Sequence, residues 1–161
     1  MSTIIAVMSA NDEVGKTISA INLGYALADN GGHVLLVDMD PKGTMTQTLG
    51  IKHNIGIPEL IGNRLNDISI YIDDDYIVRH SKNIDCIPSS NKLSIIELLL
   101  AVDENIAKGT FHSLPGNYDY TIFDCQTGLS RLNSNIIDVA DSLILPTLAT
   151  IESMYYLGAA E

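Results

Sequence analysis

Three short polar segments of this 161-residue chain carry the residue types that could do chemistry. The first ends in Val14-Gly15-Lys16-Thr17, the second is Asp38-Met39-Asp40-Pro41-Lys42-Gly43, and the third begins at Asp124. A glycine, a lysine and a hydroxyl in this order suit a phosphate group, because backbone N–H groups and the amine bind its oxygens while the hydroxyl binds Mg²⁺. Carboxylates at strand ends can hold the metal or orient a water beside the phosphate.

Each segment also has a plainer explanation. A Gly-Lys-Thr triplet occurs by chance, and the acids at positions 38, 40 and 124 could simply cap turns at strand ends. A nicotinamide-dependent oxidoreductase would share the same alternation of strands and helices. No GxGxxG follows the first predicted strand, which disfavours that enzyme class, although Asp38 stands roughly 20 residues beyond the loop as a ribose-binding acid would.

The elements that must position these segments follow from the apolar pattern. Five continuous apolar runs predict strands at Ile4–Met8, Val34–Val37, Ile84–Pro88, Tyr120–Phe123 and Ser142–Leu145. Helices are predicted at Lys16–Asp29, Ile57–Gly62, Asn91–Asn105 with Ser90 or Asn91 as cap, Ser134–Val139 and Ile151–Glu161, and a polar loop at Asp38–Thr48.

Continuous apolar strands are covered on both faces, which indicates a parallel sheet. The sequence therefore predicts an α/β fold of three layers, with a mostly parallel sheet flanked by helices. Ligands of such sheets bind beyond the carboxyl ends of the strands. We expect this edge to bring together the loops Ser9–Thr17, Asp38–Thr48 and Asp124–Arg131.

The overall composition restricts the partners. The net charge is −11, from 9 basic and 20 acidic residues, which disfavours direct DNA binding and attachment to an anionic membrane. No apolar run reaches the ~18 residues that a membrane span needs. Cys86 and Cys125 lie far apart in the chain, as expected of reduced thiols in a cytoplasmic protein.

A family resemblance rests on three stretches of sequence. Residues 24–43, GYALADNGGHVLLVDMDPKG, followed by a segment that ends at Leu49-Gly50, resemble the helix, strand and acidic turn of the ParA/MinD group of partitioning ATPases. Tyr118–Cys125 is similar to the Walker B strand of that group, and Ala140–Pro146 to the strand after it. The resemblance implies a single P-loop NTPase-like domain over residues 1–161 that lacks the C-terminal part of the family domain.

The resemblance also implies a cofactor, partners and roles for individual residues. ATP or ADP would bind with Mg²⁺, a nucleotide-dependent homodimer would form, and a ParB-like protein would activate a switch used in plasmid or chromosome partitioning or in positioning cargo. The implied roles are nucleotide binding by Val14, Gly15, Lys16, Thr17 and Ile18, catalysis by Lys16 and Asp40, magnesium binding by Thr17 and Asp124, and a structural role for Asp38.

The first loop departs from the family pattern Lys-Gly-Gly-x-Gly-Lys-Thr. Asn11 stands where the signature lysine is expected, and Asp12 and Glu13 replace two glycines. A like-charge pair at 4 Å costs about 4 kcal/mol at an effective dielectric of 20, roughly half of the free energy of micromolar binding. Unless these carboxylates point to solvent, they weaken ATP binding, so the alternative is a catalytically inactive ParA-fold module that binds a protein.

Two further departures concern the other loops. Gln126 and Thr127 stand where the family usually has proline, which changes the third loop but leaves Asp124 in place. In the second loop, Lys42 is expected to pair with Asp40.

Overall fold

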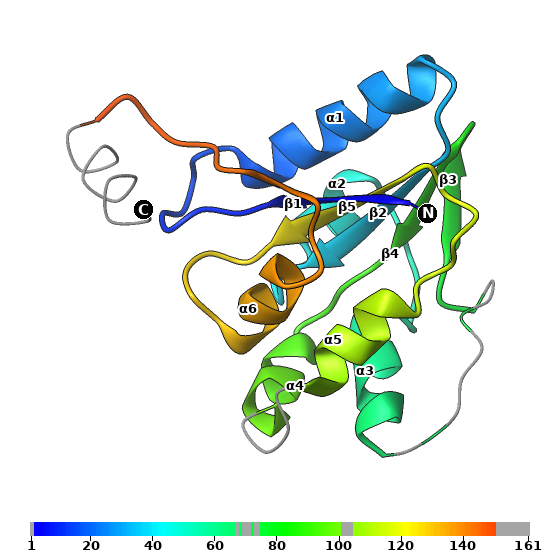
Figure 1. Ribbon diagram of the computed structural model, residues 1–161, viewed down its shortest axis with the longest axis vertical. Coiled ribbons are helices and arrows are strands. Elements are labelled where there is room, and N and C mark those ends of the chain that lie inside the picture. Colours follow the sequence, from blue (N-terminus) through cyan, green and yellow to red (C-terminus); the bar gives the residue numbers. More distant parts are fainter. Residues whose placement is uncertain (1, 67, 69–71, 73–74, 101–104, 151–161) are drawn as a thin grey trace.

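The computed structural model describes residues 2–66, 68, 72, 75–100 and 105–150, which form a sheet with helices on both faces (Figure 1). The strands are β1 (Thr3–Val7), β2 (Val34–Met39), β3 (Val78–Ser81), β4 (Ile84–Ile87), β5 (Tyr120–Cys125) and β6 (Ser142–Ile144). The helices are α1 (Lys16–Asp29), α2 (Thr44–Thr48), α3 (Ile57–Leu65), α4 (Leu93–Leu99), α5 (Asn105–His112) and α6 (Arg131–Ile137).

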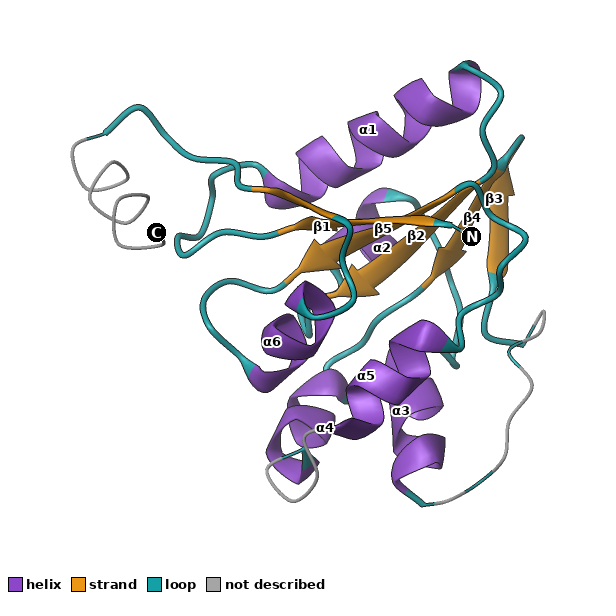
Figure 2. Ribbon diagram, viewed as in Figure 1, coloured by secondary structure: helices purple, strands orange, loops and turns teal. Residues whose placement is uncertain are grey.

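The sheet has the strand order β3-β4-β2-β5-β1-β6. All neighbouring strands run parallel except the pair β3 and β4, which is antiparallel. The helix α1 covers one face, and α3, α4, α5 and α6 lie on the other (Figure 2). The predicted three-layer fold with a mostly parallel sheet is therefore confirmed.

The strand β2 shows why this sequence buries both faces of the sheet. Every residue of β2 is buried. Val34 and Leu36 pack with the α1 side of the core, whereas Leu35, Val37 and Met39 pack with the helices of the opposite face. Because successive side chains of a strand point to opposite faces, an uninterrupted apolar run is what a central parallel strand requires.

The register of the three central strands aligns their carboxyl ends. Asp124 on β5 is the pairing partner of Val7 on β1 and of Asp38 on β2. The loop after β1, the acidic turn after β2 and the loop after β5 therefore begin at the same level of the sheet, as the sequence predicted.

Several elements differ from the prediction. The segment expected to be a polar loop from Asp38 to Thr48 instead extends β2 to Met39 and contains the short helix α2. The buried Asp38 can lie near the end of this strand because its carboxylate accepts hydrogen bonds from the following loop. A prediction based on apolar runs does not detect such a residue. The edge strand β3 was missed because its sequence, VRHS, has no apolar run.

The predicted helix Asn91–Asn105 was also wrong in its extent. Helix α4 begins at Leu93 after Lys92, with neither Ser90 nor Asn91 as its cap, and ends at Leu99, while α5 begins at Asn105. Helix α6 begins at Arg131, three positions before the predicted start, because Ser130 accepts a hydrogen bond from the Asn133 N–H (3.0 Å) and caps it. The predicted helix Ile151–Glu161 lies outside the described residues.

Among the described residues, none of the helices combines the length and the apolarity needed to cross a membrane.

Candidate functional site

The loop between β1 and α1 has the backbone of a tight turn that leads into a helix. Gly15, the residue before α1, has φ 89° and lies in the left-handed region that glycine favours. Glu13 also has a positive φ, of 58°, although it is not glycine. Helix α1 therefore begins in the loop that follows the carboxyl end of β1, and the N-terminal end of a helix favours an anion.

The side chain of Lys16 is buried in this loop and is directed toward the loop after β5. Its ammonium donates a hydrogen bond to Thr127 Oγ1 at 2.6 Å and to the Asn11 carbonyl oxygen at 3.3 Å. Sequence reasoning treated Thr127 only as a departure from the family loop, so this partner of Lys16 was missed. The structure thus brings the predicted phosphate-binding lysine to the edge where the three loops meet.

Asp124 is the least satisfied polar group of the site. It is 1% exposed, and neither carboxylate oxygen has a hydrogen-bond partner among the described residues. Burial is the main reason that the pKa of Asp124 is raised to about 7. The nearby Thr17 hydroxyl lowers this pKa, although it does not reach hydrogen-bonding geometry, and the charge of Asp38 raises it.

These observations fit a divalent cation. A buried carboxylate with both oxygens unpartnered is strongly unfavourable unless it is protonated or neutralised by a positive charge. The Thr17 hydroxyl and the Asp124 carboxylate are both hard oxygen donors, which Mg²⁺ prefers. The two residues predicted to bind magnesium therefore lie in a setting that suits it.

Asp38 lies beside Asp124 on the neighbouring strand, and its carboxylate is fully engaged. Oδ2 accepts hydrogen bonds from Thr46 N (2.9 Å) and Thr46 Oγ1 (2.6 Å), and Oδ1 accepts one from Asp40 N (3.1 Å). Burial raises the pKa of Asp38, and the bonds from Thr46 oppose this rise. Asp38 therefore holds the turn together, in agreement with the structural role expected of it.

The predicted catalytic residue Asp40 is half-buried in the turn after β2. Its Oδ1 accepts a hydrogen bond from the Lys42 backbone N–H at 2.8 Å, and its carbonyl oxygen accepts one from Gly43 N at 2.8 Å. The charge of Asp40 contributes to the raised pKa of Asp124. The two carboxylates thus lie close enough to interact, at the same edge as Lys16.

The expected pairing of Lys42 with Asp40 is wrong for the side chain. Lys42 Nζ lies 3.5 Å from Asp12 Oδ1, so the ammonium pairs with the loop after β1. The same Asp12 oxygen accepts a hydrogen bond from Thr127 Oγ1. The pairing could not be read from the sequence, because positions 12, 42 and 127 meet only when the three loops converge.

The loop after β5 is held by residues that sequence reasoning did not identify. Asn133, which is buried, donates hydrogen bonds to the carbonyl oxygens of Gln126 (2.9 Å) and Gly128 (2.6 Å). Glu97 on α4 accepts hydrogen bonds from Gln126 Nε2 (3.2 Å) and Arg131 N (2.7 Å). Glu97 looked like an ordinary polar residue on the surface of a predicted helix, and Asn133 lay just before the predicted start of the next helix, so neither carried a signal of its own. This bracing fixes the loop that presents Thr127 to Lys16.

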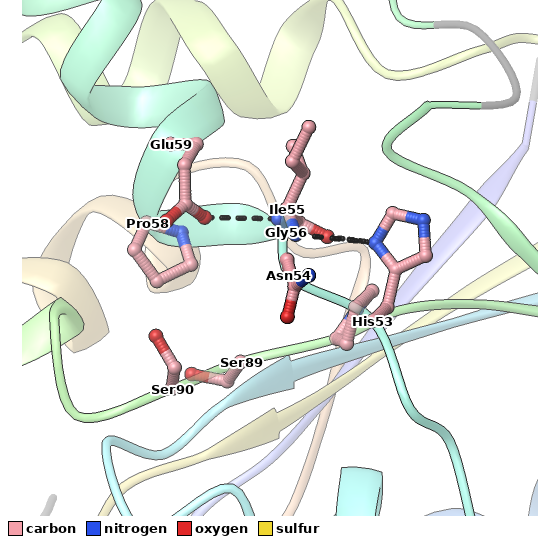
Figure 3. A pocket seen from close by; sticks show the side chains of 9 residues that line it. His53, Asn54, Ile55, Gly56, Pro58, Glu59, Ser89 and Ser90 are labelled. Carbon is pink, nitrogen blue, oxygen red and sulfur yellow. Dashed lines mark hydrogen bonds between the residues drawn. The ribbon is translucent and has the colours of Figure 1, made fainter.

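A separate small hollow lies between the start of α3, with the segment before it, and the loop after β4 (Figure 3). His53, Asn54, Ile55 and Gly56 line it together with Pro58, Glu59, Pro88, Ser89 and Ser90. Its cavity volume is about 10 Å³, which is room for roughly one water molecule. It therefore offers no space for a larger ligand.

Comparison with protein families matches residues 2–158 to a model described as an AAA domain. The chain is 34% identical over 161 residues to the sporulation initiation inhibitor protein Soj of Bacillus subtilis, covering 97% of this chain and 60% of that protein. It is 32% identical over 146 residues to the chromosome partitioning protein ParA of Myxococcus xanthus, covering 89% of this chain and 51% of ParA. The chain thus spans between half and two thirds of the length of these curated relatives.

Among solved structures, the chain is similar to cobyrinic acid a,c-diamide synthase from Mycobacterium smegmatis with bound ADP and magnesium. The TM-score is 0.83 at 29% sequence identity, and the match covers 98% of this chain and 66% of that one. The similarity extends over the strands and loops that form the site described above.

Proposed function

This chain belongs to the AAA-domain family and, within it, to the ParA/MinD group, and from that premise we propose that it binds ATP with Mg²⁺ as a nucleotide-dependent switch. The observation that carries the proposal is the buried Asp124 carboxylate, which has no hydrogen-bond partner within the described part of the chain and lies beside Thr17 and near Lys16. A neighbour of the same fold binds ADP and magnesium, which supports the same ligand here.

Each residue of the site has a proposed part in binding. The backbone from Val14 to Ile18 surrounds the phosphates, and Lys16 contacts the oxygens of the terminal groups. Thr17 and Asp124 would hold Mg²⁺. Bound Mg²⁺ neutralises the phosphate oxygens and lowers the barrier to phosphoryl transfer.

Hydrolysis is the second part of the proposal. Asp40 lies at the end of β2, where its carboxylate can accept a proton from a water or orient it for attack. Lys16 stabilises the negative charge that develops on the transferred phosphoryl group. Asp38 holds the turn that carries Asp40 and takes no part in the reaction itself.

The biological role proposed from the relatives is partitioning of a plasmid or chromosome, or the placement of another cargo. It involves a homodimer that forms with bound nucleotide and an activating protein of the ParB type. The support is the similarity to the chromosome partitioning protein ParA, of which this chain matches 51% of the length.

A second candidate function is a ParA-fold protein that binds a partner without turning over ATP. The loop residues favour it, because Lys16 is already engaged by Thr127 and by the Asn11 carbonyl, and the acids Asp12 and Glu13 replace glycines. In that case nucleotide is absent or bound without hydrolysis, and the fold serves as a docking module.

Isothermal titration calorimetry of Mg-ATP into the purified chain, followed by a hydrolysis assay, separates the candidates. The switch predicts micromolar binding that Lys16→Ala abolishes, that EDTA weakens and that Asp40→Ala leaves intact. A hydrolysis assay then compares the wild type with Asp40→Ala, which is expected to bind ATP but to lose turnover. Absence of binding up to millimolar ATP would reject the switch and leave the docking module.

A further inference from the structure

One carboxylate oxygen of the loop after β1 is surrounded by groups that ordinarily bind anions. Asp12 Oδ1 accepts a hydrogen bond from Thr127 Oγ1 and lies 3.5 Å from Lys42 Nζ. Thr127 Oγ1 in turn accepts a hydrogen bond from Lys16 Nζ at 2.6 Å. One amine and one hydroxyl thus contact the exposed Asp12 carboxylate directly, and the Lys16 amine is linked to it through Thr127 Oγ1.

The carboxylate is present in its charged form. The hydrogen bond from Thr127 is the main reason that the pKa of Asp12 is lowered, and the charge of Lys42 lowers it further. Phosphate oxygens are bound by the same chemistry, because ammonium and hydroxyl groups donate charge-assisted hydrogen bonds to any oxyanion. Asp12 therefore makes the contacts that a phosphate oxygen would make at this place.

We propose that Asp12 sets the affinity of the phosphate site, because its carboxylate engages Thr127 and Lys42 in the nucleotide-free protein and is displaced when a magnesium nucleotide binds. This inference rests on the proposed nucleotide-binding function. Binding then requires the release of Asp12 from its partners, which lowers the net affinity. Once released, Thr127 and Lys42 donate to the phosphate groups, and Lys42 supplies a positive charge that Asn11 does not.

The neighbouring residue Glu13 provides a matched control. It carries the same charge one position further along the loop, and its side chain is exposed. In the part of the chain that the structure describes, no hydrogen bond or ion pair involves the Glu13 side chain. Removing its charge changes the general electrostatic potential of the loop without releasing Thr127 or Lys42.

The test is calorimetric titration of Mg-ADP and Mg-ATP into four proteins: the wild type, Asp12→Asn, Glu13→Gln and the double variant Asp12→Asn with Lys16→Ala. Asparagine keeps the shape of aspartate and removes the charge, so we expect Asp12→Asn to tighten binding by about three- to fivefold, the size of effect typical of an exposed ion pair. Glu13→Gln, acting only through screened charge, is expected to change affinity by less than about twofold. The Lys16→Ala change is expected to abolish binding by the double variant, which shows that the ligand occupies the same site.

Three results would overturn the inference. Unchanged or weaker binding by Asp12→Asn would mean that its carboxylate does not compete with phosphate. Equal tightening by Asp12→Asn and Glu13→Gln would mean that only the overall charge matters. If none of the proteins binds nucleotide, the proposed function fails as well. If the wild type binds through Lys16 but Asp12→Asn shows no gain in affinity, the proposed function stands and only this inference fails.

Discussion

The ends of β2 and β5 place two aspartates side by side on neighbouring strands, yet their surroundings differ. Asp38, at the end of β2, accepts hydrogen bonds from Thr46 N, Thr46 Oγ1 and Asp40 N. Asp124, at the end of β5, is equally buried and has no hydrogen-bond partner for either oxygen among the described residues.

The difference separates a carboxylate that the chain itself satisfies from one that fits the proposed metal ligand. A buried charge that the chain itself satisfies stabilises the local fold, whereas one left unsatisfied destabilises the free protein and is retained where a ligand completes it. In this protein the turn after β2 donates hydrogen bonds to the Asp38 carboxylate. The Asp124 carboxylate on β5 instead lies near Lys16 and Thr17 without a hydrogen bond among the described residues. Substitutions at the two strand ends test this difference.

The largest effect is expected from Asp38→Ala. The change leaves two N–H groups and one hydroxyl without an acceptor in a buried turn, so we expect the free energy of unfolding to fall by about 3 to 5 kcal/mol. Urea denaturation monitored by circular dichroism measures it. The exposed Asp29, at the end of α1, serves as control: Asp29→Ala should lie within about 0.5 kcal/mol of the wild type. Equal losses for the two variants would remove the distinction between β2 and β5.

Asp124→Asn is expected to act in the opposite direction. The pKa of Asp124 is about 7 in the folded protein and 3.8 in the ordinary reference state. Its contribution to stability is therefore fully present below about pH 4 and is lost as pH rises to about 7. We expect Asp124→Asn to stabilise the protein by roughly 2 to 4 kcal/mol at pH 8 in EDTA, and by less at pH 5.

The same variant is expected to lose the response to ligand. Mg-ATP should raise the melting temperature of the wild type at pH 8 but not that of Asp124→Asn, because the variant lacks the anionic metal ligand. Thermal melts with and without Mg-ATP make this comparison. A variant that is less stable than the wild type in EDTA at pH 8 would show that Asp124 has an internal partner and resembles Asp38.

Thr46→Val tests whether Asp38 can be made to resemble Asp124. Valine keeps the shape of threonine but removes the hydroxyl that donates to Asp38 and accepts from Ser89 N at 3.0 Å. We expect a loss of about 1 to 2 kcal/mol in the free energy of unfolding and a further rise in the pKa of Asp38. If the pKa of Asp38 rises, the free energy of unfolding of the variant should decrease more steeply with rising pH than that of the wild type. An unchanged pH profile would contradict the expected rise in pKa.

The smallest effect is expected where the loop after β5 enters α6. Ser130 accepts a hydrogen bond from Asn133 N at 3.0 Å, so Ser130→Ala should cost about 1 kcal/mol in a urea titration. The corresponding helix after β2, α2, is preceded by Gly43 and has no side-chain cap. Ser130→Thr, which retains the hydroxyl, is the control and should recover most of the loss.

Much of this arrangement could be predicted from local sequence. The helix Lys16–Asp29 has the predicted bounds, and the central strands were located because their apolar runs are continuous. The strand β3 and the helix α2 could not be predicted in the same way, because their residues are polar and are placed by pairing with β4 and by the hydrogen bonds of Asp38.

The α/β architecture and the grouping of three polar loops at one edge of the sheet could be inferred from the amino-acid sequence, because apolar runs are local features and helical crossovers between parallel strands put the loops after those strands at one edge. Which carboxylates are hydrogen-bonded depends instead on the folded arrangement. Asp38 and Asp124 are both aspartates that end apolar strands, and Lys42 stands next to Pro41 and near Asp40 in sequence but pairs with Asp12. Hydrogen bonds and ion pairs depend on distances of a few ångströms between segments far apart in the chain, and those distances exist only once the sheet has brought its strand ends together.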